Sequence, residues 1–164
     1  MKKILLLSIL LWTGWVSAQA IDLDKENRDP KYVESIVSRS QKIVDKLGIN
    51  DAKVAEDVRN VIANRYFTLN DIYETRDAKV KEIKESDLVG EAKNNALKAA
   101  EDAKDAALYR IHFAFPADLS LFLTEEQIEA VKDGMTYGVL KITYDSHLDM
   151  IPSLKKEEKA QIYA

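Results

Sequence analysis

The sequence predicts an all-α protein, a helical bundle with a long antiparallel helical hairpin and a short irregular loop region that contains tyrosine and glycine. Two observations predict this fold class. Apolar residues recur at helical spacing along most of the chain, and residues that favour helix ends stand where these patterns begin and stop. The length of residues 29–164 suits a single domain, and we expect one domain there.

Residues 1–20 have the composition of a secretory signal peptide. A short cationic start at residues 2–3 precedes an apolar stretch at residues 4–16 and then several small residues. We expect cleavage after Ala18 or after Ala20, and therefore export to the periplasm or the extracellular space. An uncleaved anchor is the alternative, but the apolar stretch is short for a bilayer core of about 30 Å.

The composition narrows the classes of partner. The chain has no cysteine, so we expect neither disulfides nor a lipoprotein anchored through cysteine. It has 24 Lys+Arg and 28 Asp+Glu, and without Lys2 and Lys3 the balance is 22 against 28, a net charge of −6. Because an acidic surface repels anions, we expect no nucleic-acid partner. We also expect no stable membrane insertion after signal cleavage.

The first helix is predicted after a lead-in without periodicity at residues 21–28, which we expect to be mobile. Asp29 is placed to cap the helix, and Pro30 suits its first position because proline has no N–H to leave unpaired. Gly48 marks the end. The apolar positions of this helix are Val33, Ile36, Val37, Val44 and Leu47.

A second and much longer helix is predicted to start at a cap formed by Asn50 or Asp51. Its apolar face continues for roughly 30 residues, or about 45 Å at 1.5 Å per residue. The positions that define this face are Val54, Val58, Val61, Ile62, Leu69, Ile72, Tyr73, Val80 and Ile83.

After a break at residues 86–90, an alanine-rich helix is predicted over residues 91–115, and Pro116 ends it. Small side chains let two helices approach closely, so we expect this segment to pack antiparallel on the preceding helix as a long hairpin. The alternative for a stretch rich in alanine and charge is a solvated arm.

The run "LTEEQI", residues 123–128, predicts a helix start. Thr124 and Gln127 have the spacing of a capping box, in which each side chain bonds to the other residue's backbone N–H. Leu123 and Ile128 have the spacing of a hydrophobic staple. We therefore interpret this run as structural.

The stretch from Gly134 to Ile151 is the predicted irregular region. Asp145 or Ser146 is expected to start a short helix that stops at Ile151, because the residue before proline avoids helical geometry. Loops on helical scaffolds often carry binding residues. The candidate ligand-binding residues are Thr136, Tyr137, Tyr144 and His147. The alternative is that these tyrosines cover the end of the hairpin.

The block at residues 115–162, and most specifically "KDGMTYG" at 132–138, resembles the family named domain of unknown function 3826. The resemblance implies secreted Bacteroidetes proteins for which sugar binding has been suggested, as accessory products of glycan utilisation. The family usually continues with a longer helix and an aromatic-rich tail. We therefore expect a C-terminal truncation, with a last helical stretch capped by Ser153.

A second resemblance is to periplasmic Spy-like chaperones, which carry the motif L-T-x-x-Q twice. Leu123, Thr124 and Gln127 match one copy, and residues 154–158 do not match the second. The alternative function is therefore a chaperone or a protein-interaction module.

Nothing in the sequence predicts an enzyme. His112 and His147 are the only histidines, and neither belongs to a recognisable metal spacing. No cysteine, phosphate-binding glycine loop or G-x-S-x-G turn supplies a nucleophile. Paired carboxylates for glycoside hydrolysis stay open because acidic residues are abundant. We expect no catalytic residues, no metal and no cofactor. The leading hypothesis is an exported, non-enzymatic protein that binds carbohydrate or assists glycan utilisation.

Overall fold

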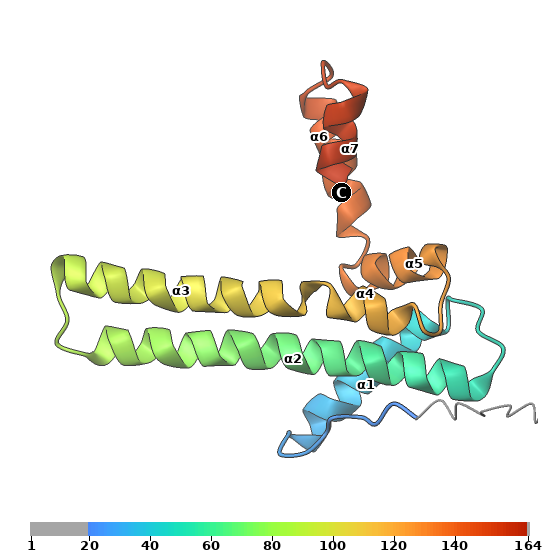
Figure 1. Ribbon diagram of the computed structural model, residues 1–164, viewed down its shortest axis with the longest axis horizontal. Helices are drawn as coiled ribbons and strands as arrows, with labels where there is room; N and C mark the ends of the chain where they lie inside the picture. The colour runs from blue at the N-terminus through green and yellow to red at the C-terminus, as the bar shows by residue number, and fades with distance from the viewer. Residues whose placement is uncertain (1–19, 164) are drawn as a thin grey trace, which may run out of the picture.

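The computed structural model describes residues 20–163, and this part of the chain is all-α, as the sequence predicts (Figure 1). Most of the signal peptide predicted at residues 1–20 lies outside the described residues. Within the described part, no helix is long and apolar enough to cross a bilayer. The helices are α1 (Pro30–Val44), α2 (Ala52–Glu85), α3 (Gly90–His112), α4 (Ala114–Leu119), α5 (Glu125–Met135), α6 (Val139–Met150) and α7 (Lys156–Tyr163).

Helices α2 and α3 form the predicted antiparallel hairpin and lie side by side over most of their length (Figure 1). The turn between them is made at Gly90, whose φ of +57° is a left-handed conformation that glycine adopts without a steric penalty. Ala100 is buried at the interface between the two helices. The alternative of a solvated arm is therefore wrong for this segment.

The core lies at the end of the hairpin that is far from this turn. There α1 crosses α2, and α4 and α5 close the other side (Figure 1). Gly134 of α5 allows close contact with α1, because a Cβ added to it would lie 3.1 Å from Ile43 Cγ1. The buried members of this main core are Ile43, Val44, Leu47, Val58, Val61, Ile62, Phe115, Leu119, Leu123, Ile128 and Val131.

The predicted capping box at the start of α5 is confirmed. Thr124 N–H donates to Gln127 Oε1 at 3.1 Å, and Gln127 N–H donates to Thr124 Oγ1 at 3.4 Å. Gln127 Nε2 also donates to the backbone oxygen of Leu47 at 2.9 Å. The cap therefore ties the start of α5 to the chain that follows α1, a tertiary role that the motif alone does not indicate.

The prediction of a short helix from Asp145 or Ser146 is wrong at its start. Gly138 adopts a φ of +73°, and this left-handed residue redirects the chain straight into α6, which begins at Val139. The predicted stop is confirmed, since α6 ends just before Ile151. The irregular region is thus reduced to the turn at residues 136–138.

Helices α6 and α7 form a small hairpin that projects away from the body (Figure 1). No residue of α6 is buried. Val139, Ile142 and Met150 are exposed on it. This segment therefore does not cover the end of the large hairpin, which was the alternative expected for its tyrosines.

The lead-in at residues 21–28 runs along α2 and makes specific contacts with it. Asp24 N–H donates to Asn64 Oδ1, and Asn64 Nδ2 donates to the backbone oxygen of Asp22, both at 2.8 Å. Arg28 pairs with Asp71 at 2.7 Å. We expected a mobile lead-in because its apolar residues show no periodicity. Such periodicity, however, carries no information on hydrogen bonds between side chains and backbone.

We expect Leu119→Ala to lower the free energy of unfolding by about 2–5 kcal/mol, because Leu119 is fully buried in the main core. Urea denaturation followed by circular dichroism measures this change. Leu121→Ala is the matched control: this leucine is 74% exposed, and its truncation should cost less than about 0.5 kcal/mol. Equal losses for both variants would contradict the assignment of the core.

Candidate functional site

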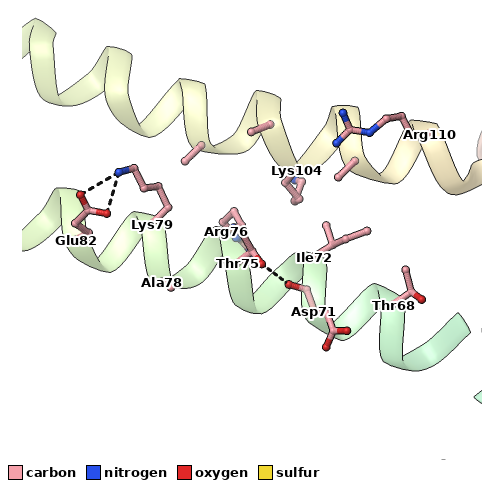
Figure 2. A pocket seen from close by; sticks show the side chains of 13 residues that line it. Thr68, Asp71, Ile72, Thr75, Arg76, Ala78, Lys79, Glu82, Lys104 and Arg110 are labelled. Carbon is pink, nitrogen blue, oxygen red and sulfur yellow. Dashed lines mark hydrogen bonds and ion pairs between the residues drawn. The ribbon is translucent and has the colours of Figure 1, made fainter. Parts of the chain in front are cut away.

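A groove lies between α2 and α3. It consists of two adjoining cavities of about 660 Å³ and about 400 Å³. Both are lined by Lys79, Glu82, Ala100 and Ala103, so they form one continuous space, which we call the α2–α3 groove. Figure 2 shows the larger cavity.

The floor of the groove is made of alanine. Ala96, Ala99, Ala100, Ala103 and Ala107 of α3 line it. An alanine side chain ends at Cβ, so it allows a close helix contact at Ala100 but cannot fill the space on either side. The alanines of α3 thus allow the close packing of the hairpin and also leave the space of the groove unfilled.

Charged side chains form the rim of the groove. Lys79 pairs with Glu82 at 2.8 Å (Figure 2). Arg76 reaches across to Glu101 of α3 at 2.7 Å. The larger cavity is lined by the cations Arg76, Lys79, Lys104 and Arg110 and by the anions Asp71 and Glu82. Most of these charges are paired, because Glu101 pairs with both Arg76 and Lys104, and Glu82 pairs with Lys79.

The carboxylate of Glu101 joins the two sides of the rim. Hydrogen bonds from Lys104, at 2.8 Å, and from Arg76 lower the pKa of Glu101. The same bonds with Glu101 raise the pKa values of Lys104 and Arg76. Arg76 Nε lies 2.8 Å from Asp77 Oδ1 but makes no hydrogen bond, so its N–H is buried without an acceptor. The network stays fully charged at neutral pH.

Arg110 differs from the other rim cations, because it forms no ion pair within residues 20–163. Its guanidinium extends from α3 at one end of the larger cavity (Figure 2). A guanidinium presents several N–H donors in one plane and suits a carboxylate. Sequence reasoning missed these cations, although Arg76 and Lys79 follow Ile72 at helical spacing and share its face of α2.

The four predicted site residues do not line the groove. The structure places them as two pairs, Thr136 with Tyr137 after α5, and Tyr144 with His147 one turn apart on α6. Thr136 closes α5, and its Oγ1 lies 3.1 Å from the backbone oxygens of Lys132 and Asp133. Tyr144 and His147 are half-buried on α6, about 10 and 15 Å along the chain from Tyr137 at 1.5 Å per helical residue. His147 Nδ1 lies 2.8 Å from the backbone oxygen of Thr143.

Tyr137 has the features of a contact residue. Its φ is +57°, a left-handed conformation that costs a residue other than glycine on the order of 1 kcal/mol. The side chain is 67% exposed. The Arg39 guanidinium lies 5.4 Å from the Tyr137 ring centroid and 5.6 Å from that of Tyr66. We call these three residues the Tyr137 surface. Burial raises the pKa of Tyr66, so its hydroxyl stays protonated.

In the sequence His147 stands between Asp145 and Asp149, and these three side chains could be considered as ligands of a divalent ion. Among residues 20–163, no group of three or more His, Asp and Glu side chains is placed to hold a metal ion. Asp145, His147 and Asp149 therefore do not form such a group. Asp145 instead pairs with Lys141 at 2.6 Å.

Comparison with protein families matches residues 33–164 to the family described as "Protein of unknown function (DUF3826)". The match includes the block at 115–162 and confirms the resemblance found in the sequence. No curated protein matches the chain.

We expect the Arg28–Asp71 pair to stabilise the fold at neutral pH and not in acid. The hydrogen bond from Arg28 lowers the pKa of Asp71, so its contribution is present above the unfolded value of about 3.9 and is lost as pH falls through the folded value. Because Asp71 is half exposed, solvent screening limits the contribution to about 1 kcal/mol. Urea denaturation of Asp71→Asn should show a loss at pH 7 that is smaller at pH 2.5.

The matched control for this measurement is Glu74→Gln, which removes an exposed carboxylate from the same helix. It should change the free energy of unfolding by less than about 0.5 kcal/mol at either pH. A loss for Asp71→Asn that is equally large in acid would show that the carboxylate charge is not what stabilises the fold.

Proposed function

The chain belongs to the DUF3826 family, and we propose that it is an exported, non-enzymatic protein whose α2–α3 groove binds a helical segment of a partner protein. The observation that carries this proposal is the continuous groove with an alanine floor and a charged rim. Export is supported by the composition of residues 1–20, and the non-enzymatic role by the lack of any recognisable nucleophile or metal motif in the sequence.

The dimensions of the groove favour a helix as the occupant. The lining residues along α2 and its C-cap run from Thr68 to Ser86, about 27 Å at 1.5 Å per residue, or five helical turns. Amphipathic helices bind such grooves through apolar residues on one face. The alanine floor leaves room for large aliphatic side chains of the partner, which would supply the packing that α3 does not.

The charge of the rim specifies the partner further. Four cations and two anions line the larger cavity, and Arg110 has no ion pair in the described part of the chain. An occupant with an Asp or Glu beside its apolar face would complement the unpaired guanidinium of Arg110. The proposed partner segment is therefore an acidic amphipathic helix.

We expect a synthetic amphipathic peptide with leucines at i, i+3, i+4 and i+7 and flanking glutamates to bind, and Ala103→Trp to weaken binding at least about tenfold. The indole would fill the alanine floor where the two cavities meet. Fluorescence anisotropy of the labelled peptide measures the affinity.

The matched control is Ala106→Trp, the same substitution at an exposed position of α3 outside the groove lining. This variant should bind like the parent protein, and equal weakening by both variants would contradict the groove as the site. Protection of an unfolded client from aggregation at stoichiometric ratio, abolished by Ala103→Trp, would identify the chaperone form of this function.

A second candidate function is carbohydrate binding at the Tyr137 surface, in an accessory role in glycan utilisation. The observation that favours it is an exposed aromatic ring held on a strained backbone beside a guanidinium. A tyrosine ring offers an apolar face to the C–H groups of a sugar, and Arg39 offers donors to its hydroxyls.

We expect Tyr137→Asn to abolish binding of any glycan that the protein binds in a panel of plant and host oligosaccharides, measured by calorimetry. The free energy of unfolding should change by less than about 1 kcal/mol. Asparagine adopts the left-handed conformation at a lower cost than tyrosine, and this gain offsets the loss of the cation–π contact with Arg39. Tyr73→Asn is the control, since Tyr73 is also an exposed tyrosine beside an arginine, Arg76. Glycan binding that survives Tyr137→Asn would exclude this surface.

A further inference from the structure

Three side chains on one face of α2 hold the backbone of the lead-in. Ile21 N–H donates to Asp57 Oδ1 at 2.9 Å, and Asn60 Nδ2 donates to the backbone oxygen of Ile21 at 2.7 Å. Asn64 makes the next pair of bonds, to residues 22 and 24. Both polar groups of Ile21 are therefore bound, and its side chain packs against the main core.

Asp57 forms no ion pair with any side chain of residues 20–163. It is 4% exposed, and Ile21 N–H is the one hydrogen-bond donor that residues 20–163 supply to it. A buried carboxylate is costly unless it is paired with a positive charge. Asp57 lies in the second turn of α2, where the favourable field of the helix N-terminus has largely decayed. A neutral peptide N–H offsets only part of this cost.

The residues before Ile21 form a signal-peptidase recognition pattern. Ala18 and Ala20 stand three positions and one position before the Ala20–Ile21 bond, which is the A-x-A arrangement. Ala20 is exposed, whereas Ile21 is half-buried. Cleavage at this bond would place the new N-terminus where the peptide nitrogen already lies, 2.9 Å from Asp57.

We propose that a signal peptidase hydrolyses the Ala20–Ile21 bond and that the resulting α-ammonium of Ile21 forms a buried ion pair with Asp57. Water adds across the bond: its hydroxyl goes to the carbonyl carbon of Ala20 and its proton to the nitrogen of Ile21. At neutral pH the new carboxyl group gives up its proton and the new amine takes one up, so residues 1–20 leave with a carboxylate and Ile21 carries an ammonium. This inference rests on the proposed export signal and is independent of the ligand of the groove.

The proposal makes the positive charge of the N-terminus a structural element. In a chain that begins two residues earlier, at Gln19, Ile21 keeps a neutral peptide N–H that donates one hydrogen bond. In a chain that begins at Ile21, the same atom carries a charge and three N–H groups. A purely geometric role for this contact would make the two chains equally stable, whereas an ion pair would not.

The test is a set of four proteins: chains that begin at Ile21 or at Gln19, each with Asp57 or with Asp57→Asn. We expect the Ile21 chain to have a folding equilibrium constant about tenfold or more above that of the Gln19 chain, because hydrogen bonds to charged groups are the strong ones. With Asp57→Asn this ratio should fall to about one. Equal stability of the two starts with Asp57 intact would overturn the ion pair.

Two further measurements apply even if Asp57→Asn does not fold. Acetylation of the Ile21 α-amine removes the charge but keeps one N–H, and it should reduce stability to that of the Gln19 chain; no loss would overturn the ion pair. Intact mass of the exported protein from a producing cell should correspond to a start at Ile21. A start at Gln19, or retention of residues 1–20, would overturn the cleavage site. Peptide binding to the groove, measured for the chains that begin at Ile21 and at Gln19, reports separately on the proposed function.

Discussion

The structure depends on the apolar contact between α1, α4, α5 and the first half of α2. Ile62, Leu119 and Val131 are fully buried there, and Gly134 allows α5 to lie against Ile43. The bond from Gln127 to the backbone of Leu47 fixes the start of α5 over the end of α1. Both the long hairpin and the α6–α7 arm extend from this one core (Figure 1).

The outer half of the hairpin has no comparable core. Ile83 and Ala100 are buried there, but the positions between α2 and α3 are otherwise held by alanine and by exposed ion pairs, which contribute little to stability. Segments with few buried apolar contacts open more readily than the core does. The same lack of side-chain volume makes the α2–α3 groove, so low local stability and an available binding surface have one physical cause.

The capping of three helices followed from the sequence, whereas other local predictions and the non-local parts of the fold did not. The last helix, α7, begins at Lys156 and is not capped by Ser153, and Pro116 lies within α4 and does not end the alanine-rich helix. Asp29, Asp51 and Thr124 cap their helices as the sequence predicts, because a cap depends on residues within one turn. The start of α6 was missed because Gly138 supports either a loop or a direct helix start. The candidate site was predicted as one set along residues 136–147, whereas helical rise separates its members. The rim cations were missed because a periodic pattern does not reveal which charges face a neighbouring helix.

The lead-in connects the core end of α2 to the groove. Arg28, at its far end, lies 4.6 Å over the ring of buried Phe67 and pairs with both Asp24 and Asp71. Asp71 is one of the two anions that line the groove, and Glu82, the other, is bound to Lys79. Because Arg28 neutralises Asp71 from outside, Arg110 is the lining charge that stays unpaired within the described part of the chain. The segment that is fixed at Ile21 by Asp57 thus also sets the sign of the charge that the groove presents to a partner.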